Sequence, residues 1–389
     1  MRASTLLALM PLAMAAPSSV RQRDSPAPLI LPRGADAIPG KYIVKLVPQK
    51  QSSSFSISSA ISSIKANADY TYGTHFHGFA ASLEDDELEN LRNNPDVLYV
   101  EQDSIVKISA TQPNAPWGLA RISNSGTNST TSTTYTYDDT AGAGTCAYIV
   151  DTGIDTEHED FEGRASWAEN FVDSSNTDGQ GHGSHVAGTV GGAKYGVAKK
   201  TSLYAVKVLG NDGSGTTSGV VAGMEFVVED APKKDCPKGV VVNMSLGGGF
   251  SQSLNDAADA ITKAGIFLAV AAGNEGADAS TSSPASAESA CTVGATDKTD
   301  GFASFSNFGE LVDVLAPGVA IESVKVGGGS TSLSGTSMAS PHVAGLAAYL
   351  LGNGASASGL CETIASSALE DVIKKVPSGT KNLLINNGA

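Results

Sequence analysis

Charged side chains, aromatic side chains and cysteine are all scarce in this sequence. Charged residues make up 17% of the 389 residues and aromatic residues 6%, and there are four cysteines. No apolar run is long enough to cross a bilayer, so a membrane-spanning helix is not expected. Glycine is abundant instead, with 43 residues beside an ordinary apolar content of 41%. So much glycine disfavours a helical bundle and favours an α/β enzyme with tight turns.

Basic residues are especially scarce in the C-terminal part of the chain. From Ala110 onward there are 29 acidic and 15 basic residues, whereas the first 109 residues carry 11 and 10. An acidic region of this kind disfavours nucleic acid and anionic membranes as partners. We therefore expect neither partner, and we expect a monomer.

The N-terminus has the pattern of a secretory signal peptide. Arg2 supplies a positive charge, residues 6–12 form a short apolar core, and Ala13-Met14-Ala15 is a small-residue cleavage site. An ordinary buried helix is the alternative. We predict a signal peptide over residues 1–15 and a secreted, extracellular protein.

The cysteines all follow residue 109. An even number in an exported chain favours two disulfides over free thiols, although three pairings are possible. No two cysteines have the short spacing of a zinc knuckle, which makes zinc a poor alternative. They are Cys146, Cys236, Cys291 and Cys361.

Residues 16–109 consist of a lead-in and a small α+β unit. The stretch 17–40 is rich in Pro, Ser and Arg and is expected to lack regular structure. The pattern then predicts strands at 42–46, 76–83 and 97–101 and helices at 57–66 and 84–93. This order indicates a small sheet with helices on one face. The pattern breaks at 109–116, where we place a domain boundary.

Two glycosylation sequons follow the boundary. Asn128 begins one of them, in a Ser/Thr-rich stretch that we expect to be a surface loop, and is the candidate glycan site. The other begins at Asn243 in an apolar run and is attributed to chance.

The remainder of the chain alternates short apolar runs with helix candidates. The runs lie at 146–151, 203–209, 240–246 and 266–271, and the helices at 182–192, 217–229 and 253–264. Apolar strands separated by helices indicate a mainly parallel sheet covered by helices on both faces. Active sites of such sheets form at the carboxyl ends of the strands.

Asp151 ends the first of these runs, in front of Thr152-Gly153. A carboxylate at this place is held rigidly, although capping of the next turn explains it equally well. Asp-Thr-Gly is also the signature of aspartic proteases, which need two such carboxylates. A second copy is absent, so that class is disfavoured.

His182 lies between two glycines at the start of a predicted helix. The glycines leave its imidazole uncrowded. His182 and His185 are spaced for metal binding, but no His-Glu-x-x-His arrangement and no nearby cysteine supports a metal site. We expect His185 to pack or bond within its own helix.

Ser337 lies in Gly335-Thr336-Ser337-Met338-Ala339, at the start of an apolar helix. Its oxygen would be near free N–H groups and the positive end of the helix dipole, and a capping serine is the simpler explanation. Gly-x-Ser also suggests an α/β-hydrolase, but those enzymes run Ser, then Asp or Glu, then His. The order here is Asp, His, Ser, as in subtilisin.

Taken together, these motifs resemble the subtilisin-like serine peptidases, specifically the fungal proteinase K branch. The resemblance covers essentially all of 110–389, and residues 40–108 resemble the inhibitory propeptide of the family. It implies a three-layer α/β catalytic domain preceded by a ferredoxin-like α+β propeptide domain, with autocleavage near Ser109–Ala110. The matching stretches are VDTGID (150–155), GHGSHVAGT (181–189), VNMSLGGG (242–249), VAAGN (270–274) and GTSMASPHVAG (335–345).

The resemblance implies a serine endopeptidase that acts on proteins and peptides through an acyl-enzyme. Ser337 attacks the scissile carbonyl, His182 accepts its proton and Asp151 orients the imidazolium. Asn274 matches the asparagine that donates to the oxyanion. The propeptide acts as intramolecular inhibitor. The alternatives are a secreted serine esterase and a catalytically inactive binding homologue.

The resemblance also assigns the substrate cleft. Two glycine-rich segments flank an extended peptide, and small residues after the fourth apolar run form one wall of the S1 pocket. Small, uncharged walls predict cleavage after aromatic or aliphatic P1 residues with broad tolerance. The cleft residues are Gly213, Ser214, Gly215, Ser245, Leu246, Gly247, Ala271 and Gly273.

Disulfides and a metal follow from the same resemblance. It pairs Cys146 with Cys236 and Cys291 with Cys361. It also implies a structural calcium site. The calcium ligands are the Asp313 carboxylate and the backbone carbonyls of Glu288 and Ala290. No catalytic cofactor is expected.

Overall fold

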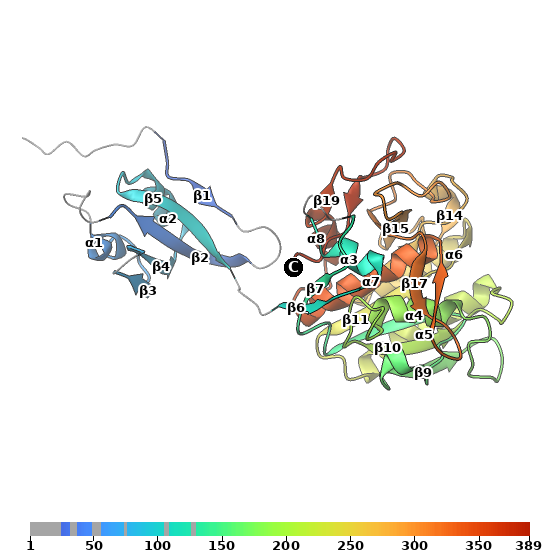
Figure 1. Cartoon of the computed structure of the whole chain (residues 1–389). Helices are drawn as coiled ribbons and strands as arrows, with labels where there is room; N and C mark the ends of the chain where they lie inside the picture. Colours follow the sequence, from blue (N-terminus) through green and yellow to red (C-terminus); the bar gives the residue numbers. More distant parts are fainter. Residues whose placement is uncertain (1–24, 32–36, 49–55, 74–75, 105–108, 126–129) are drawn as a thin grey trace, which may run out of the picture. The chain divides into compact units, whose positions relative to one another are not determined.

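The computed structural model describes residues 25–31, 37–48, 56–73, 76–104, 109–125 and 130–389. The chain divides into two compact units, Met1–Val106 and Lys107–Ala389 (Figure 1). The predicted signal peptide and the Asn128 sequon lie outside the described residues. Among the helices of the described part, none combines the length and the apolarity that crossing a bilayer requires.

The smaller unit is a five-stranded sheet with two helices. Its strands lie in the order β1-β5-β2-β4-β3, and all neighbours are antiparallel except β1 and β5. Ala60 from one helix and Leu88 and Leu91 from the other fill one core against the sheet. Apart from the short β1, the order βαββαβ is the ferredoxin-like arrangement. The elements are β1 (Leu29–Ile30), β2 (Ala37–Leu46), α1 (Ile57–Ile61), β3 (Ala68–Tyr72), β4 (Gly78–Ser82), α2 (Asp85–Asn93) and β5 (Val97–Ser104).

The sequence pattern does not reveal β3, and it makes α1 too long. Residues 69–71 of β3 are exposed, so this edge strand lacks the alternation that marks a half-buried one. The helix predicted over 57–66 ends at Ile61. The hydroxyls of Ser62 and Ser63 donate to the carbonyls of Ser58 and Ala60, a local bond that competes with helix continuation.

The expectation that residues 17–40 lack structure is wrong for the described part of that stretch. Leu29–Ile30 forms β1 beside β5, and β2 begins at Ala37. Ala27 is fully buried in the core of the small unit. Backbone pairing and burial of one small side chain order a segment whose composition suggests a linker.

The larger unit is built on a nine-stranded sheet. Its order is β19-β20-β16-β15-β13-β11-β8-β10-β9, and every pair of neighbours is parallel except β19 with β20. The strands are β8 (Thr145–Asp151), β9 (Ala165–Asn170), β10 (Ser202–Lys207), β11 (Gly239–Met244), β13 (Phe267–Ala271), β15 (Cys291–Thr296), β16 (Val314–Pro317), β19 (Leu369–Glu370) and β20 (Leu383–Leu384).

Helices cover both faces of this sheet. Ala147 and Ile149 of β8 belong to a core shared with α4 and α7, whereas Tyr148 and Val150 belong to a second core shared with α5 and α6. The mainly parallel three-layer α/β fold is therefore confirmed (Figure 1). The helices are α3 (Trp117–Ile122), α4 (His182–Gly191), α5 (Thr217–Asp230), α6 (Gln252–Lys263), α7 (Thr336–Gly352) and α8 (Leu360–Ser366), with short 3-10 turns at Glu159–Phe161, Ala231–Lys233 and Ala279–Thr281.

Small two-stranded sheets complete the unit. The break predicted at 109–116 contains a strand, because Ser109–Gln112 pairs with a strand beyond the Ser/Thr-rich loop. Periodicity does not reveal such short strands, since they are stabilised by a partner distant in sequence. The pairs are β6 (Ser109–Gln112) with β7 (Tyr135–Asp138), β12 (Gly248–Gly249) with β14 (Ser282–Ser283), and β17 (Ile321–Val324) with β18 (Ser330–Leu333).

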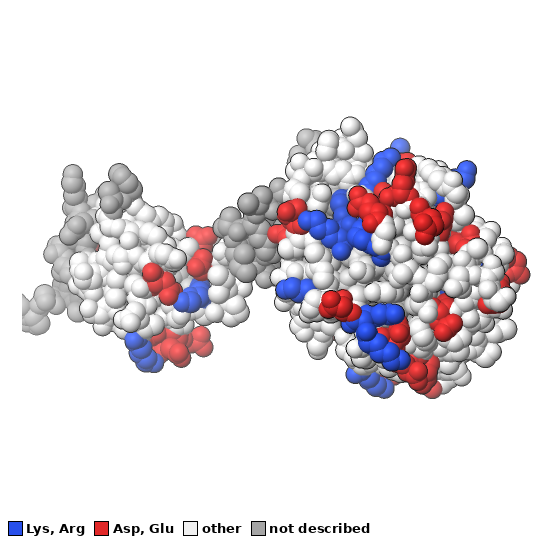
Figure 2. Space-filling view, turned by 90° about the horizontal axis from the view of Figure 1, so that it is seen from below, with Lys and Arg blue, Asp and Glu red and all other residues white. Residues whose placement is uncertain are grey.

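The surface of the larger unit carries its charges in mixed groups. In the face that Figure 2 shows, acidic and basic side chains lie next to one another between broad uncharged areas. The acidic excess is therefore not concentrated in one field on this face. Ion pairs such as Lys200–Asp139 and Lys263–Asp259 are largely exposed and contribute little to stability.

A buried ion pair is different, and we predict that Arg121→Met is strongly destabilising. Arg121 of α3 donates from Nε to Asp300 Oδ1 at 2.8 Å, and its side chain is 3% exposed. The variant leaves the Asp300 carboxylate buried without its partner, which should lower the free energy of unfolding by about 3–5 kcal/mol in denaturant titrations. Lys263→Met, the exposed control, should change it by less than about 1 kcal/mol. Equal effects of the two variants would contradict the prediction.

Candidate active site

A buried carboxylate faces an imidazole at the carboxyl end of β8. Asp151 is fully buried, and its Oδ1 accepts the N–H of Thr152 at 2.7 Å. His182 Nδ1 lies 2.8 Å from Oδ1 and 3.0 Å from Oδ2 of the same carboxylate. Nδ1–H therefore donates to Asp151, and Nε2 is the nitrogen available to a reacting group.

The charge around His182 favours the imidazolium. Burial of the ring works to lower the pKa of His182, but the charge and hydrogen bond of Asp151 and the charge of Asp178 outweigh it. The pKa of His182 is therefore raised above its ordinary value. A histidine of this kind accepts a proton more readily than one in water.

Ser337 lies in the first turn of α7. Its hydroxyl donates to the carbonyl of Ser245 at 3.1 Å, and the Ser245 hydroxyl donates to the Ser337 carbonyl at 2.7 Å. Ser337 and His182 line one cavity. A hydrogen bond from Ser337 to His182 would require the hydroxyl to rotate away from Ser245, and hydrogen bonds of this kind often form only when a substrate binds.

Asn274 is anchored beside Ser337 by its carbonyl side. Its Oδ1 accepts hydrogen bonds from the N–H and the hydroxyl of Thr336, at 2.8 and 3.0 Å. Among the described residues, Nδ2 donates no hydrogen bond, and Asn274 lines a cavity with Ser337. The amide is thereby oriented with a free donor at the site.

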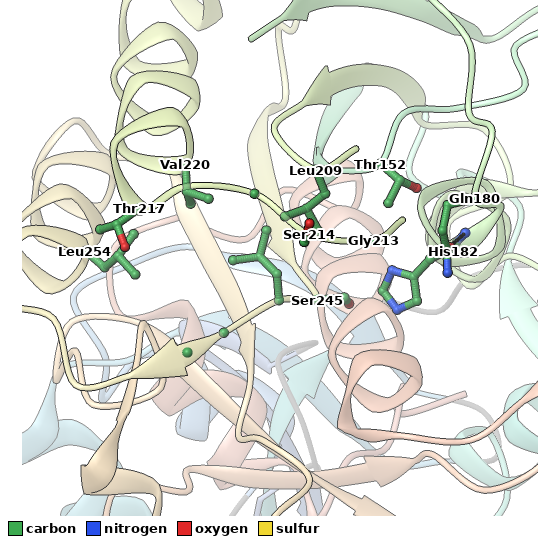
Figure 3. A pocket seen from close by; sticks show the side chains of 14 residues that line it. Thr152, Gln180, His182, Leu209, Gly213, Ser214, Thr217, Val220, Ser245 and Leu254 are labelled. Carbon is green, nitrogen blue, oxygen red and sulfur yellow. Dashed lines mark hydrogen bonds between the residues drawn. The ribbon is translucent and has the colours of Figure 1, made fainter. Parts of the chain in front are cut away.

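Two chain segments form the sides of a cleft that runs away from His182. Figure 3 shows the segment of Gly213 and Ser214 on one side and Ser245 on the other, with the imidazole at one end. Val220 and Leu254 supply an apolar far end. The predicted cleft residues Gly213, Ser214, Gly215, Ser245, Leu246 and Gly247 all line this cavity.

A second cavity lies beside Ser337 and has small walls. Ala271 and Gly273 line it together with Leu246, Gly247 and Asn274. Gly273 has φ +107°, and a Cβ there would come 2.3 Å from the Asn307 amide nitrogen. Position 273 therefore requires glycine, because any side chain there would displace Asn307.

Two other buried histidines, His185 and His342, make structural contacts. His185 is fully buried, as the packing alternative predicts, but its Nε2 bonds to the carbonyl of Ile321 on β17, at 3.0 Å, and not within its own helix. His342 Nδ1 bonds to the Met338 carbonyl at 2.8 Å. Burial lowers the pKa of both histidines to about 4.

The Asn243 side chain is also fully buried, bonded to Ser245 and Ser340, and cannot receive a glycan.

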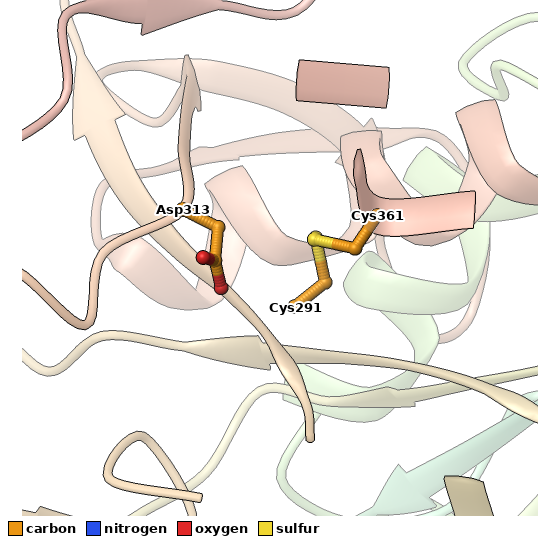
Figure 4. Close-up of side chains that lie close together, drawn as sticks. All are labelled: Cys291, Asp313 and Cys361. Carbon is orange, nitrogen blue, oxygen red and sulfur yellow. A yellow bond between two sulfur atoms is a disulfide. The ribbon is translucent and has the colours of Figure 1, made fainter. Parts of the chain in front are cut away.

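The disulfides join Cys146 to Cys236 and Cys291 to Cys361. Asp313 lies beside the second disulfide (Figure 4), the one cluster of metal-ligand residue types among the described residues. The disulfide sulfurs have no thiolate charge to offer a metal. Asp313, Glu288 and Ala290 line one cavity, together with Lys381.

Sequence reasoning missed several residues of the site. Thr152 and Gln180 line the cleft, and Lys325 and Leu333 line the cavity that holds both His182 and Ser337. Asp178, which bonds to Gly181 and Ser184 on either side of His182, was missed as well. Thr152 directly follows Asp151, so the rule that active sites form at the carboxyl ends of parallel strands could have identified it. The others carry no local signal, because loops far apart in the sequence bring them to the site.

A serine, an imidazole and a buried carboxylate at the carboxyl edge of a parallel sheet are the arrangement of a serine hydrolase, and the order Asp, His, Ser separates it from the α/β-hydrolases. Comparison with known proteins narrows this class. Residues 142–382 match the model of the subtilase family, and residues 41–109 match that of the peptidase inhibitor I9 family.

Related proteins match this chain over its whole length. A cuticle-degrading protease of Metarhizium anisopliae is 49% identical and both chains are covered completely, and proteinase R of Parengyodontium album is 51% identical over 100% of this chain and 99% of its own. Proteinase T of the same fungus is 64% identical over 75% of this chain and 98% of its own. A crystal structure of a cold-adapted subtilisin-like serine proteinase matches with a TM-score of 0.63 and 41% identity, covering 70% of this chain and 98% of that one.

The chain belongs to the subtilase family, in its proteinase K branch, and is a serine endopeptidase with an I9-type propeptide domain. The resemblance stated from the motifs is confirmed.

We predict that His185 and His342 make the protein sensitive to acid. Their pKa values are about 4 in the folded chain, against an ordinary value of 6.5. Below pH 6.5 the unfolded chain takes up protons at both residues and the folded chain does not, so their contribution to stability is complete above pH 6.5 and lost toward pH 4. Each histidine can lower the free energy of unfolding by up to about 3 kcal/mol over this pH range.

Thermal unfolding between pH 7 and pH 4, with a covalent serine-protease inhibitor present, tests this. The melting temperature should fall through that window, and the double variant His185→Gln with His342→Gln should flatten the slope. A slope that is the same in both proteins would assign the acid sensitivity to other groups.

Proposed function

We propose that this protein is a secreted endopeptidase with Asp151, His182 and Ser337 as its catalytic triad. Ser337 Oγ attacks the scissile carbonyl while His182 Nε2 accepts its proton, and Asp151 holds the imidazolium. His182 then protonates the leaving amine, and water hydrolyses the acyl-enzyme by the reverse steps. The observation that carries the proposal is the 2.8 Å contact of His182 Nδ1 with the buried Asp151, in a cavity shared with Ser337.

Asn274 is proposed as the oxyanion donor, with the Ser337 N–H as its companion. The fixed orientation of its amide by Thr336 supports this role, because a donor that is already aimed needs no reorganisation during the reaction. A carbonyl oxygen that becomes negative between these two donors is stabilised more than the neutral carbonyl is.

The substrate is proposed to lie extended between the segments 213–215 and 245–247, as an added strand. The small cavity beside Ser337 would receive the P1 side chain. Its walls of alanine, glycine and Leu246 favour aromatic or aliphatic side chains. An esterase is the weaker alternative, because a cleft with two peptide-like edges offers backbone pairing that a simple ester does not use.

The propeptide is proposed to comprise residues 16–109, with 110–389 as the mature enzyme. The I9 match supports an inhibitory role for the small unit. Cleavage near Ser109–Ala110 would fall within β6, which is paired with β7, so the junction has to leave this pairing to be cut. The proposal that the protein is exported rests on the signal-peptide pattern of residues 1–15.

We predict that Asn274→Ala lowers kcat about 10²–10³-fold with little change in KM, because the lost donor acts on the transition state. Kinetics on a peptide anilide with active-site titration measure this. Ser337→Ala should abolish turnover and labelling by a sulfonyl fluoride. Turnover that survives in Ser337→Ala would reject the triad.

Calcium is proposed as a structural ion, and the residues present fit it. Asp313 supplies a hard carboxylate oxygen and Glu288 and Ala290 line the same cavity, where their carbonyls would complete the set. Asp313 Oδ2 accepts the N–H of Thr292, and Oδ1 lies 2.9 Å from Lys381 Nζ. An ion bound here therefore competes with the Lys381 ammonium.

We predict that millimolar calcium raises the melting temperature relative to EDTA, since a ligand of the folded state stabilises it. Lys381→Met should enlarge this shift by removing the competing cation, and Asp313→Asn should abolish it. Differential scanning fluorimetry on inhibited protein gives the readout. An equal shift in Asp313→Asn would place the calcium elsewhere.

A further inference from the structure

The helix that carries His182 has an unusual N-terminus. Its cap residue, Gly181, has φ +94° and no side chain with which to cap. The first three N–H groups of α4 are nevertheless bonded, each to a side chain from outside the helix. The acceptors are Gln180 Oε1 for His182 (2.7 Å), Thr152 Oγ1 for Gly183 (2.9 Å) and Asp178 Oδ2 for Ser184 (2.9 Å).

Asp178 is the most highly connected of these acceptors. Its side chain is buried, with the residue 4% exposed, and every group bonded to its carboxylate is a donor. Such an arrangement suits an ionised carboxylate, which can only accept. The donors to Oδ1 are Thr152 Oγ1 (2.8 Å), Gly181 N (2.8 Å) and Gln180 N (3.2 Å), and those to Oδ2 are Ser184 N (2.9 Å) and Ser184 Oγ (2.7 Å).

These bonds connect the helix to the strand that ends at Asp151. Thr152 directly follows Asp151 and donates its own N–H to the Asp151 carboxylate at 2.7 Å. The Thr152 hydroxyl donates to Asp178 and accepts from Gly183, so one hydroxyl spans the two segments. The backbones are also in direct contact, since a Cβ on Gly183 would lie 2.2 Å from the Gly153 carbonyl oxygen.

We propose that Asp178 is a positioning residue, which fixes the start of α4 against the end of β8 and so sets the contact between Asp151 and His182. Its negative charge also favours the imidazolium that forms when Ser337 loses its proton. The inference rests on the proposed function, because it assigns Asp178 a role through the triad. Asp178 does not itself line the cleft or the cavity of Ser337, so it acts through the segments of Thr152 and His182 to which it is bonded.

Other charged groups near His182 also affect its pKa. Asp151 and Asp178 are the two carboxylates whose charge raises the pKa of His182 against the effect of burial. Lys207 on β10 is fully buried and donates to the Thr152 carbonyl at 2.6 Å. Further titratable or charged groups in this part of the described chain are His185 on α4, Asp155 after β8 and Lys325 on the rim of the cavity.

The first test is Asp178→Asn in mature, active-site-titrated enzyme. The new amide keeps the shape of the carboxylate but places an N–H group against donors and removes the charge. We expect kcat/KM to fall about 10–100-fold, mostly in kcat, because small misplacements of catalytic groups have effects of this size. We also expect the acid limb of the kcat/KM profile to move to lower pH, because His182 loses a nearby negative charge.

Asp173→Asn is the matched control. Asp173 is an exposed aspartate between β9 and α4, with Oδ1 bonded to Ser175 N at 2.8 Å and Asn170 Nδ2 at 3.1 Å. This variant should leave both kcat/KM and the acid limb unchanged. A folded Asp178→Asn enzyme within twofold of the wild-type kcat/KM, with an unmoved acid limb, would overturn the proposal.

A second variant separates geometry from charge. Thr152→Val removes the hydroxyl that links Asp178 to Gly183 but keeps the Asp178 charge, so kcat should fall while the acid limb stays in place. If Asp178→Asn fails to fold, the test rests on Thr152→Val, and an unchanged kcat of this variant refutes the positioning role of Asp178. Turnover in Ser337→Ala would instead reject the triad on which the inference rests.

Discussion

The Asp151 carboxylate is fully buried at the end of a strand that is itself buried on both faces, and its stability there depends on His182 and Thr152. A carboxylate without such partners is costly to bury, because it loses its hydration. The strand end, the loop before α4 and the first turn of α4 must therefore be held in one arrangement. Asp178 and the hydroxyl of Thr152 supply most of the bonds that do so.

A second set of bonds fixes the serine side of the site to the same sheet. Ser245, at the end of β11, exchanges hydrogen bonds with Ser337, and Asn243 bonds to Ser245 and Ser340. Asn274, after β13, accepts from Thr336. Neighbouring parallel strands end at the same edge, so α7 is held by β11, which lies next to β8, and by β13, which lies next to β11. The imidazole and the serine reach one cavity from the first turns of α4 and α7, two segments that lie far apart in the sequence.

Several buried polar side chains of this unit bond to backbone carbonyls. His185 and His342 bond to carbonyls, and Lys207 donates to the Thr152 carbonyl. These contacts tie α4 to β17, hold the first turns of α7, and support the turn after Asp151. They are structural in kind, yet each lies within a few residues of a group of the site. Stability and site geometry are therefore linked by the same short segments.

The sequence by itself determined the fold class, the family and the residues of the site that carry motifs, because each of these leaves a local pattern. Apolar runs show a strand buried on both faces, and the flanking glycines of His182 and Ser337 mark close approaches. The short strands β3, β6 and β17, the edge strands of the sheet and the end of α1 were not visible, since their stability depends on distant partners or on single serine hydroxyls. Only the tertiary structure decided that Asp178 bonds to the start of α4, that Lys381 bonds to Asp313 and that His185 bonds to β17. Hydrogen bonds between segments far apart in the sequence fix these contacts, and no periodicity of one segment contains them.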